Sequence, residues 1–214
     1  MGAIDDNGAA RDAVLAKVRA ALRKGGDSAR AAAAARAYVA ARSHGPRPAM
    51  PDDLVERFMR RAIDMESSVE RLASVDLVPH AVARYLDALD VDASADGGTA
   101  GMASRSGVCW PEFAALDWAS AGLAIEPRPA EGGDRLGITG AFCAVAETGT
   151  LVVTSGAATP TASMLLPETH VAVVRAERIV AGMEEAFALV RRERGVMPRA
   201  VNFVSGPSRT GDIE

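Results

Sequence analysis

The segment from residue 170 to residue 206 constrains the fold of this 214-residue sequence more than any other part. "HVAVV", residues 170–174, is a continuous apolar run of the kind that forms a strand buried on both faces of a parallel sheet. "IVAGMEEAFALVRRER", residues 179–194, has the spacing of a helix, and "RAVNFVSG", residues 199–206, predicts the next strand. The apolar face of this helix consists of Ile179, Met183, Phe187 and Val190. The pattern predicts a strand–helix–strand unit with a right-handed connection.

The first 50 residues are predicted to form a helical segment and a linker. Val14, Val18 and Leu22 are one helical turn apart, and "SARAAAAARAYVAARS", residues 28–43, is rich in alanine with Ser28 as a candidate cap. "HGPRPAMP", residues 44–51, then breaks the pattern with three prolines and a glycine. We therefore predict a helical N-terminal segment over 1–50 and an α/β domain over 51–214.

Helices and short strands alternate from residue 52 onward. Helices are predicted over 52–65, 79–90 and around 113–119, a loop over 92–101, and short strands over 67–72, 107–110 and 123–128. This alternation predicts an α/β fold, in which helices cover a largely parallel sheet.

Charge and hydropathy exclude several classes of protein. The net charge is -4 and the basic residues are scattered, so nothing favours binding to nucleic acid. The sequence has no apolar run of 18 residues, and so no membrane span is predicted. The start, "MGAIDDNGAA", is acidic and does not resemble a secretory signal, which favours a cytoplasmic location.

Two cysteines, Cys109 and Cys143, are the only thiols in the chain. Neither belongs to a C-x-x-C pair, and zinc or iron–sulfur sites usually require about four ligands, most of them thiolates. We predict that both cysteines lie reduced in the core and that the chain holds no metal.

One carboxylate interrupts the apolar stretch "AVAETGTLVV", residues 144–153. "FCAVAE" and "TLVVTS" both read as strands, and Thr148 and Gly149 between them suit a tight hairpin turn with glycine at positive φ. This turn carries Glu147 to a strand end. There Glu147 either accepts hydrogen bonds from its own turn or faces a cleft as a base, nucleophile or ligand acceptor.

His170 opens a strand in "LLPETHVAVV", residues 165–174. A histidine at a strand mouth can act as an acid–base group or can hold a loop through its two ring nitrogens. Position alone favours the structural role. Together with Glu147, His170 is nevertheless a candidate catalytic residue.

The stretch "SGPSRTGDIE", residues 205–214, follows a predicted buried strand, where α/β sheets bind ligands. Its hydroxyls, its glycine N–H groups and Arg209 could cradle an anion, although the P-loop spacing is absent. The alternative is a capped helix start, which Asp212 and Glu214 would favour. The candidate ligand-binding residues are Thr148, Gly149, Thr150, Gly206, Pro207, Ser208, Arg209, Thr210 and Asp212.

Three stretches in this order resemble the LUD domain family and, within it, the C subunit of the bacterial lactate utilization complex. They are "GITGAFCAVAETGTLVV", "LLPETHVAVV" and "SGPSRTGDIE", and "LDWASAGL" also fits. The resemblance covers roughly Asp52 to the end. Glu147, Thr148 and Gly149 match one motif, His170 matches the second, and Gly206 to Glu214 match the third.

The resemblance implies a three-layer α/β sandwich similar to phosphosugar isomerases and CoA transferases. It implies a role in oxidising L-lactate to pyruvate, within an assembly whose other subunits carry the iron–sulfur clusters. No cofactor is then expected on this chain. This expectation agrees with its two cysteines.

Two departures from the family pattern stand out. Gly211 replaces a usual alanine. The family usually continues beyond the position of Glu214 with a G-x-H-G-P motif and a last strand. Either a partner or a second copy covers the open sheet edge, or this version is impaired, or the sequence is a truncated product. Because an uncovered edge strand favours association, we expect an oligomer or a complex.

Two classes of function follow, and whether the chain is an enzyme is left open. The first is a subunit of lactate oxidation that binds a small anion or a partner. The second is a stand-alone isomerase or CoA-transferase-like enzyme that uses Glu147, because "ETG" resembles the "ENG" stretch of some CoA transferases. A pure scaffold is the third reading, and it predicts no stabilisation by any small anion.

Overall fold

The computed structural model describes residues 7–21, 28–43, 45–95 and 105–207. It divides into two units, Met1–Pro48 and Ala49–Glu214, and each is described by itself. No helix in the described part of the chain is both long enough and apolar enough to cross a membrane.

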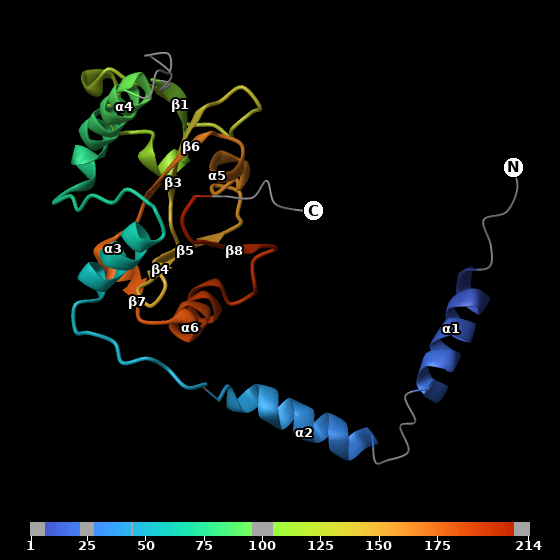
Figure 1. The fold of residues 1–214 in the computed structure, drawn as a ribbon. Helices are drawn as coiled ribbons and strands as arrows, with labels where there is room; N and C mark the ends of the chain where they lie inside the picture. Colours follow the sequence, from blue (N-terminus) through green and yellow to red (C-terminus); the bar gives the residue numbers. More distant parts are fainter. Residues whose placement is uncertain (1–6, 22–27, 44, 96–104, 208–214) are drawn as a thin grey trace, which may run out of the picture. The chain divides into compact units, whose positions relative to one another are not determined.

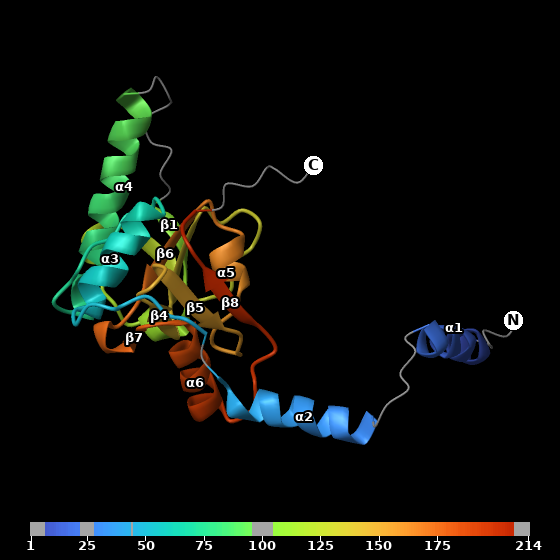
Figure 2. The same ribbon diagram turned by 60° about the horizontal axis from the view of Figure 1, so that its bottom comes forward.

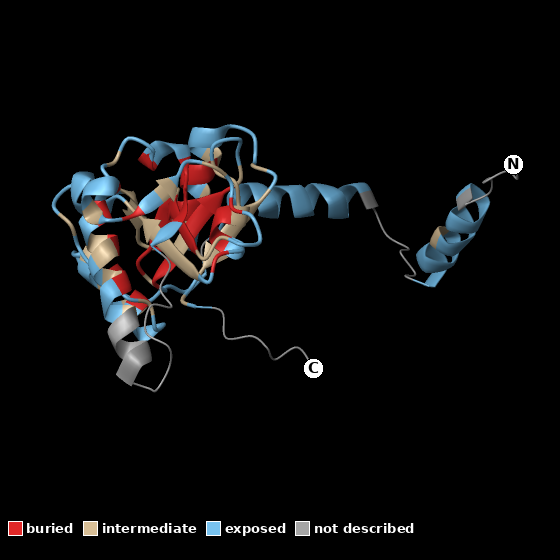
Figure 3. Ribbon diagram, turned by 90° about the horizontal axis from the view of Figure 1, so that it is seen from above, coloured by how far each residue is buried: buried red, intermediate tan, exposed pale blue. Residues whose placement is uncertain are grey.

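The first unit holds two helices, α1 (Asn7–Ala21) and α2 (Ser28–Ala41), as predicted. Ser28 is the first helical residue of α2 and does not precede the helix as a cap. Val14 and Val18 are 59% and 47% exposed, so the predicted apolar stripe of α1 is not covered within this unit. Helix α2 is also exposed, because its alanines offer little surface to bury (Figure 3).

The second unit contains two four-stranded sheets, which Figure 1 shows with their helices. The parallel sheet has the order β2-β1-β3-β6, with strands β1 (Ser106–Cys109), β2 (Ala124–Glu126), β3 (Leu136–Gly140) and β6 (Thr169–Val173). The mixed sheet has the order β7-β4-β5-β8, with strands β4 (Cys143–Val145), β5 (Thr150–Thr154), β7 (Ile179–Val180) and β8 (Val201–Val204).

The chain passes between the sheets through Ala141 and Phe142, which separate β3 from β4. Ala141 N donates to Val173 O of the parallel sheet over 3.0 Å, and Phe142 N donates to Val152 O of the mixed sheet over 2.8 Å. Every residue of β3 and β4 is buried, and Figure 3 shows buried strands at the centre of this unit. The crossing is therefore bonded to both sheets.

The predicted sheet and crossover differ from those observed. The α/β class is confirmed, but the strands form a parallel sheet and a mixed sheet. The prediction that residues 170–174 and 199–206 are the two strands of one strand–helix–strand unit is wrong, because β6 and β8 lie in different sheets. β8 instead runs in the same direction as β7, since β7 is parallel to β4 while β4 and β8 are each antiparallel to β5.

Helix α6 (Met183–Arg194) connects β7 to β8, and it is shorter than predicted. Residues 179 and 180 pair with β4 as strand β7, so they do not join the helix. Gly182 precedes the first turn, and its backbone N donates to Glu185 Oε2 over 3.0 Å. Met183, assigned to the apolar face, is 44% exposed.

Helices α3 (Leu54–Asp64), α4 (Val78–Ala95) and the short α5 (Ala162–Leu165) complete the unit. Asp53 caps α3, because its side chain accepts from Glu56 N over 2.9 Å. Figures 1 and 2 both show α4 near β1 and α6 near the opposite end of the unit. Helix α4 buries Val78, Val82 and Leu86 in the main core.

Two of the smaller predicted elements are wrong, and β3 and α5 were not predicted. Residues 67–72 form no strand. The helix expected around 113–119 is replaced by two 3-10 turns, Pro111–Phe113 and Ala119–Ala121. Between them the Asp117 side chain accepts from Ser120 N over 3.1 Å, which starts a new turn and interrupts a continuous helix.

Two turns that contain glycine, at Gly149 and Gly206, pack closely against the C-terminal end of α3. Gly149 has φ +69°, and a Cβ there would lie 2.5 Å from Ala62 N. Gly206 has φ +72°, and a Cβ there would lie 2.2 Å from Met65 O. Both turns require glycine for two reasons: the backbone conformation and the close approach of a second backbone.

Gly149→Ala should therefore destabilise the protein by about 3 kcal/mol, because it combines left-handed strain with a backbone clash. Gly122→Ala is the matched control, since Gly122 has φ +70° with nothing within 4 Å of an added Cβ. The control should cost only about 1–2 kcal/mol. Urea unfolding measures both changes, and equal losses would show that the contact with α3 is unimportant.

Candidate functional site

The predicted hairpin is present between β4 and β5, with Val145 opposite Thr150. Its turn spans four residues, 146–149, where two were predicted, and Gly149 N donates to Val145 O over 3.0 Å. The turn is longer because residues 146 and 147 stay paired to the neighbouring strand segment. Ala146 N donates to Val180 O over 2.8 Å, and Glu147 N donates to Ala181 O over 3.0 Å.

The turn brings the first and third predicted stretches together through a chain of hydroxyls. Thr148 Oγ1 is 2.6 Å from Thr150 Oγ1, which is 2.5 Å from Ser205 Oγ. Thr150 is buried, whereas Thr148 and Ser205 are exposed. The buried Thr150 hydroxyl thus joins two hydroxyls at the surface of the domain.

Some of the remaining predicted site residues are described by the structure, and the others lie beyond residue 207, where the described part of the chain ends. Gly206 and Pro207 follow Ser205 directly, while Ser208, Arg209, Thr210 and Asp212 lie outside the described residues. Glu147 is half-buried at the strand end. Among the described residues, no group hydrogen-bonds to its carboxylate.

His170 lies away from this turn, in the parallel sheet. Its register partner is Gly137, near the start of β3, whereas Glu147 follows the end of β4. His170 Nε2 is 2.8 Å from Thr139 Oγ1, and Thr139 is fully buried. Burial lowers the pKa of His170 to about 4, so the ring stays neutral near pH 7 and its observed contact is structural.

The lowered pKa of His170 makes stability depend on pH. The unfolded chain binds a proton at a higher pH than the folded chain does, so stability should fall as the pH drops from about 6.5 towards about 4. His170→Gln should reduce this fall, measured by urea unfolding across that window. His80→Gln, at an exposed position of α4, controls for the loss of a histidine. A stability difference between wild type and His170→Gln that does not vary with pH would contradict the assignment.

A pocket that the sequence did not predict lies at the point where the strand order of the parallel sheet reverses. From β1 the chain continues to β2 on one side, whereas β6 lies beside β3 on the other, so the carboxyl ends of β1 and β3 form the switch point. Ligands bind at such points in α/β sheets. The cavity measures about 240 Å³ and is lined by Trp110, Glu112, Ala141, Phe142, Thr154, Ala158, Thr159 and Arg194.

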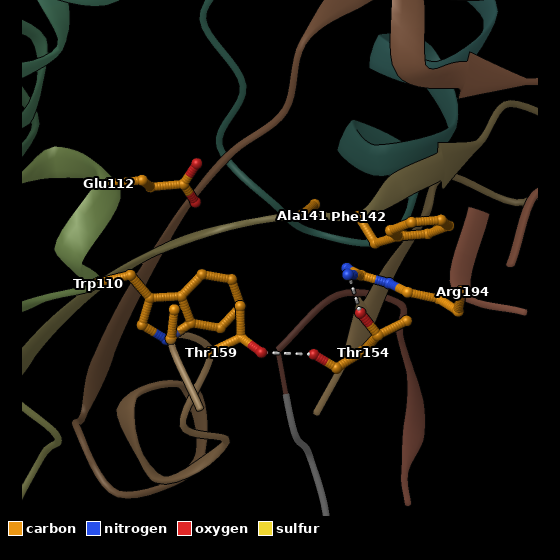
Figure 4. Close-up of a pocket in the computed structure, with 8 residues that line it drawn as sticks. Trp110, Glu112, Ala141, Phe142, Thr154, Thr159 and Arg194 are labelled. Carbon is orange, nitrogen blue, oxygen red and sulfur yellow. Dashed lines mark hydrogen bonds between the residues drawn. The ribbon is translucent and has the colours of Figure 1, made fainter. Parts of the chain in front are cut away.

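Both sheets contribute to this pocket. Trp110 follows β1, Ala141 and Phe142 follow β3, and Thr154 ends β5. Figure 4 shows the Arg194 guanidinium between Phe142 and Thr154, with Glu112 on the opposite side of the space. Trp110 is fixed in place, because its Nε1 donates to Pro160 O over 3.2 Å.

The Glu112 carboxylate lies against Gly140 at the edge of the pocket. A Cβ on Gly140 would lie only 2.1 Å from Glu112 Oε1, so the carboxylate occupies the space that a side chain would fill. Desolvation raises the pKa of Glu112, and the charge of Arg175 partly opposes the shift. The residue as a whole is exposed, so one face of the carboxylate still meets water.

The sequence carried one signal for this pocket. Trp110 ends a predicted strand and Glu112 follows it, and the rule applied to residues 205–214 applies equally there. Arg194 carried no such signal, because an arginine in the last turn of a helix usually balances the helix dipole.

No group of three metal-ligating side chains occurs in the described part of the chain. Cys109 and Cys143 are buried and unpaired, as predicted. Burial raises the pKa of each thiol to about 11, so both remain protonated at neutral pH.

The fold and the pocket together define an α/β domain with a small crevice at the switch point of a parallel sheet. Residues 120–214 match the LUD domain family. The predicted resemblance to this family is therefore confirmed over this segment of the chain.

Relatives from several bacteria carry the name lactate utilization protein C. The protein from Bacillus licheniformis is 35% identical over 82 residues, and that from Geobacillus sp. (strain WCH70) is 37% identical over 82 residues. Each match covers 37% of this chain and 34% of the relative. The protein from Bacillus subtilis is 33% identical over 110 residues, 46% of each chain. The chain thus spans less than half the length of these relatives.

A crystal structure of a DUF162 family protein from Deinococcus radiodurans has a similar fold. The two chains superpose with a TM-score of 0.55 at 24% sequence identity, over 74% of this chain and 90% of the other. At this identity the similarity concerns the fold alone.

Proposed function

We propose that this chain is a component of L-lactate utilization that carries no iron–sulfur cluster and binds a small anionic ligand or a partner subunit. The supporting observation is the match to proteins named lactate utilization protein C. Its partners are iron–sulfur subunits of a cytoplasmic bacterial complex that oxidises lactate to pyruvate, and it also pairs with copies of itself. Its domain is a three-layer sandwich like those of phosphosugar isomerases and CoA transferases.

The segment from residue 205 to residue 212 supports an anion site in this proposal. Ser205 joins the hydroxyls of Thr148 and Thr150 at the surface of the domain. Gly206 has φ +72°, and Gly206 and Pro207 are the last described residues after β8 and Ser205. In the proposed site, Ser208, Arg209 and Thr210 supply the donors and Asp212 balances the charge of the arginine.

Deleting this chain from its host should abolish growth on L-lactate, because the complex would lack one component. Reintroducing the wild-type chain should restore both growth and lactate oxidation, while growth on glucose stays unchanged throughout. Oxidation of lactate at the wild-type rate in the deletion strain, with no related protein present, would contradict the proposal.

A second candidate function is an isomerase or CoA-transferase-like enzyme with Glu147 as base or nucleophile. One observation favours it: the half-buried Glu147 carboxylate has no hydrogen-bond partner among the described residues and stands beside Thr148. A carboxylate that no protein group engages is free to accept a proton or to attack a substrate, as a base or nucleophile must be.

Glu147→Gln separates the two candidates, because it removes the carboxylate while keeping the size of the side chain. The enzyme hypothesis predicts a loss of turnover of at least about 100-fold with sugar phosphates or acyl-CoAs as substrates. Glu131→Gln, at an exposed position, is the control. Turnover that survives Glu147→Gln in a folded protein would exclude the catalytic role.

A further inference from the structure

Two arginines contact Phe142, and only one of them forms an ion pair among the described residues. Arg178 and Arg194 both stack on the Phe142 ring, with their Cζ atoms 4.7 Å and 5.0 Å from its centroid. Arg178 is neutralised, because its two terminal nitrogens donate to the two oxygens of Glu193, each over 2.9 Å. Arg178 Nε also donates to Phe142 O over 2.8 Å. The Arg178 guanidinium is therefore fully engaged in contacts within the domain and is not free to bind a ligand.

Arg194 is held in place without being neutralised. Its Nη2 donates to Thr154 Oγ1 over 3.1 Å, and Thr154 is buried. Among the described residues, no carboxylate lies within ion-pair distance of Arg194. Stacking on Phe142 and the bond to Thr154 orient the guanidinium, so its remaining donors can meet a ligand without reorganisation.

The opposite wall of the pocket supplies acceptors. Glu112 places its carboxylate against Gly140. Thr159 donates its hydroxyl proton to Thr154 O over 2.7 Å, which leaves its oxygen free to accept. Between these walls, Trp110 and Phe142 contribute aromatic side chains to the lining. The pocket thus offers one oriented cation on one side and acceptors on the other.

This arrangement selects a ligand by charge and by size. One guanidinium matches one carboxylate in a forked pair. A phosphate dianion would meet the negative charge of Glu112, whereas a hydroxyl on a monocarboxylate could donate to it. The cavity of about 240 Å³ lies below the range of drug-sized sites and suits a molecule with few heavy atoms.

We propose that this pocket binds a small hydroxycarboxylate, with its carboxylate on Arg194 and its hydroxyl donating to Glu112. The class of ligand follows from the pocket, and the inference rests on the proposed function only in choosing L-lactate as the first probe.

Titration calorimetry of the full chain with L-lactate tests the proposal. Arg194→Gln should weaken binding by about 10- to 100-fold, the effect of removing a charge-assisted hydrogen bond. Arg192→Gln is the matched control, because Arg192 lies two residues earlier in α6, is exposed and does not line the pocket. It should bind L-lactate like wild type.

Gly140→Ala tests the opposite wall. The added methyl group would displace Glu112 Oε1, the end of a flexible side chain, so binding should weaken while the melting temperature changes little. Propionate, which lacks the hydroxyl, should bind at least about 5-fold more weakly than L-lactate if that hydroxyl forms a hydrogen bond.

Four results would overturn the proposal: no binding of L-lactate, equal binding by wild type and Arg194→Gln, propionate binding as tightly as lactate, or inorganic phosphate binding more tightly than lactate. The deletion strain keeps this failure distinct from that of the proposed function. Restored growth without lactate binding would remove the pocket proposal alone. Lactate binding to a chain whose deletion has no effect would remove the proposed function alone.

Discussion

Two backbone hydrogen bonds at Ala141 and Phe142 fix the point where the chain crosses from one sheet of the domain to the other, and the placement of the pocket depends on this crossing. Adjacent residues bond to different sheets, one to Val173 and the next to Val152. The buried strands β3 and β4 lie on either side of this crossing. Because Phe142 is fixed here, its ring is available as the support on which Arg178 and Arg194 both stack.

Local patterns predicted most elements, and long-range pairing was where the prediction failed. Apolar spacing located α3 and α4 and the hairpin of β4 and β5, because each reflects contacts between residues near in sequence. The same apolar character could not tell which sheet β6 and β8 would join. Residues 179 and 180 fit a helical stripe equally well, and only β4 beside them makes them a strand.

The candidate site was predictable in part, and for related reasons. The sequence placed Glu147 at a strand end and required a left-handed Gly149, both of which are local properties of a hairpin. It could not reveal that Thr150 reaches Ser205, 55 residues later. It also could not reveal Arg194 in the switch-point pocket, because that placement depends on where α6 ends relative to β5.

The residues that line the pocket come from two parts of the chain, one inside and one outside the segment that matches the LUD family. Phe142, Thr154 and Arg194 lie inside the LUD-matched segment of residues 120–214, whereas Trp110 and Glu112 come before it. A protein that inherited only that segment would carry the basic wall without its acidic counterpart. Ligand preference in this architecture can therefore diverge through substitutions in the turn after β1, while the arginine and its aromatic support stay unchanged.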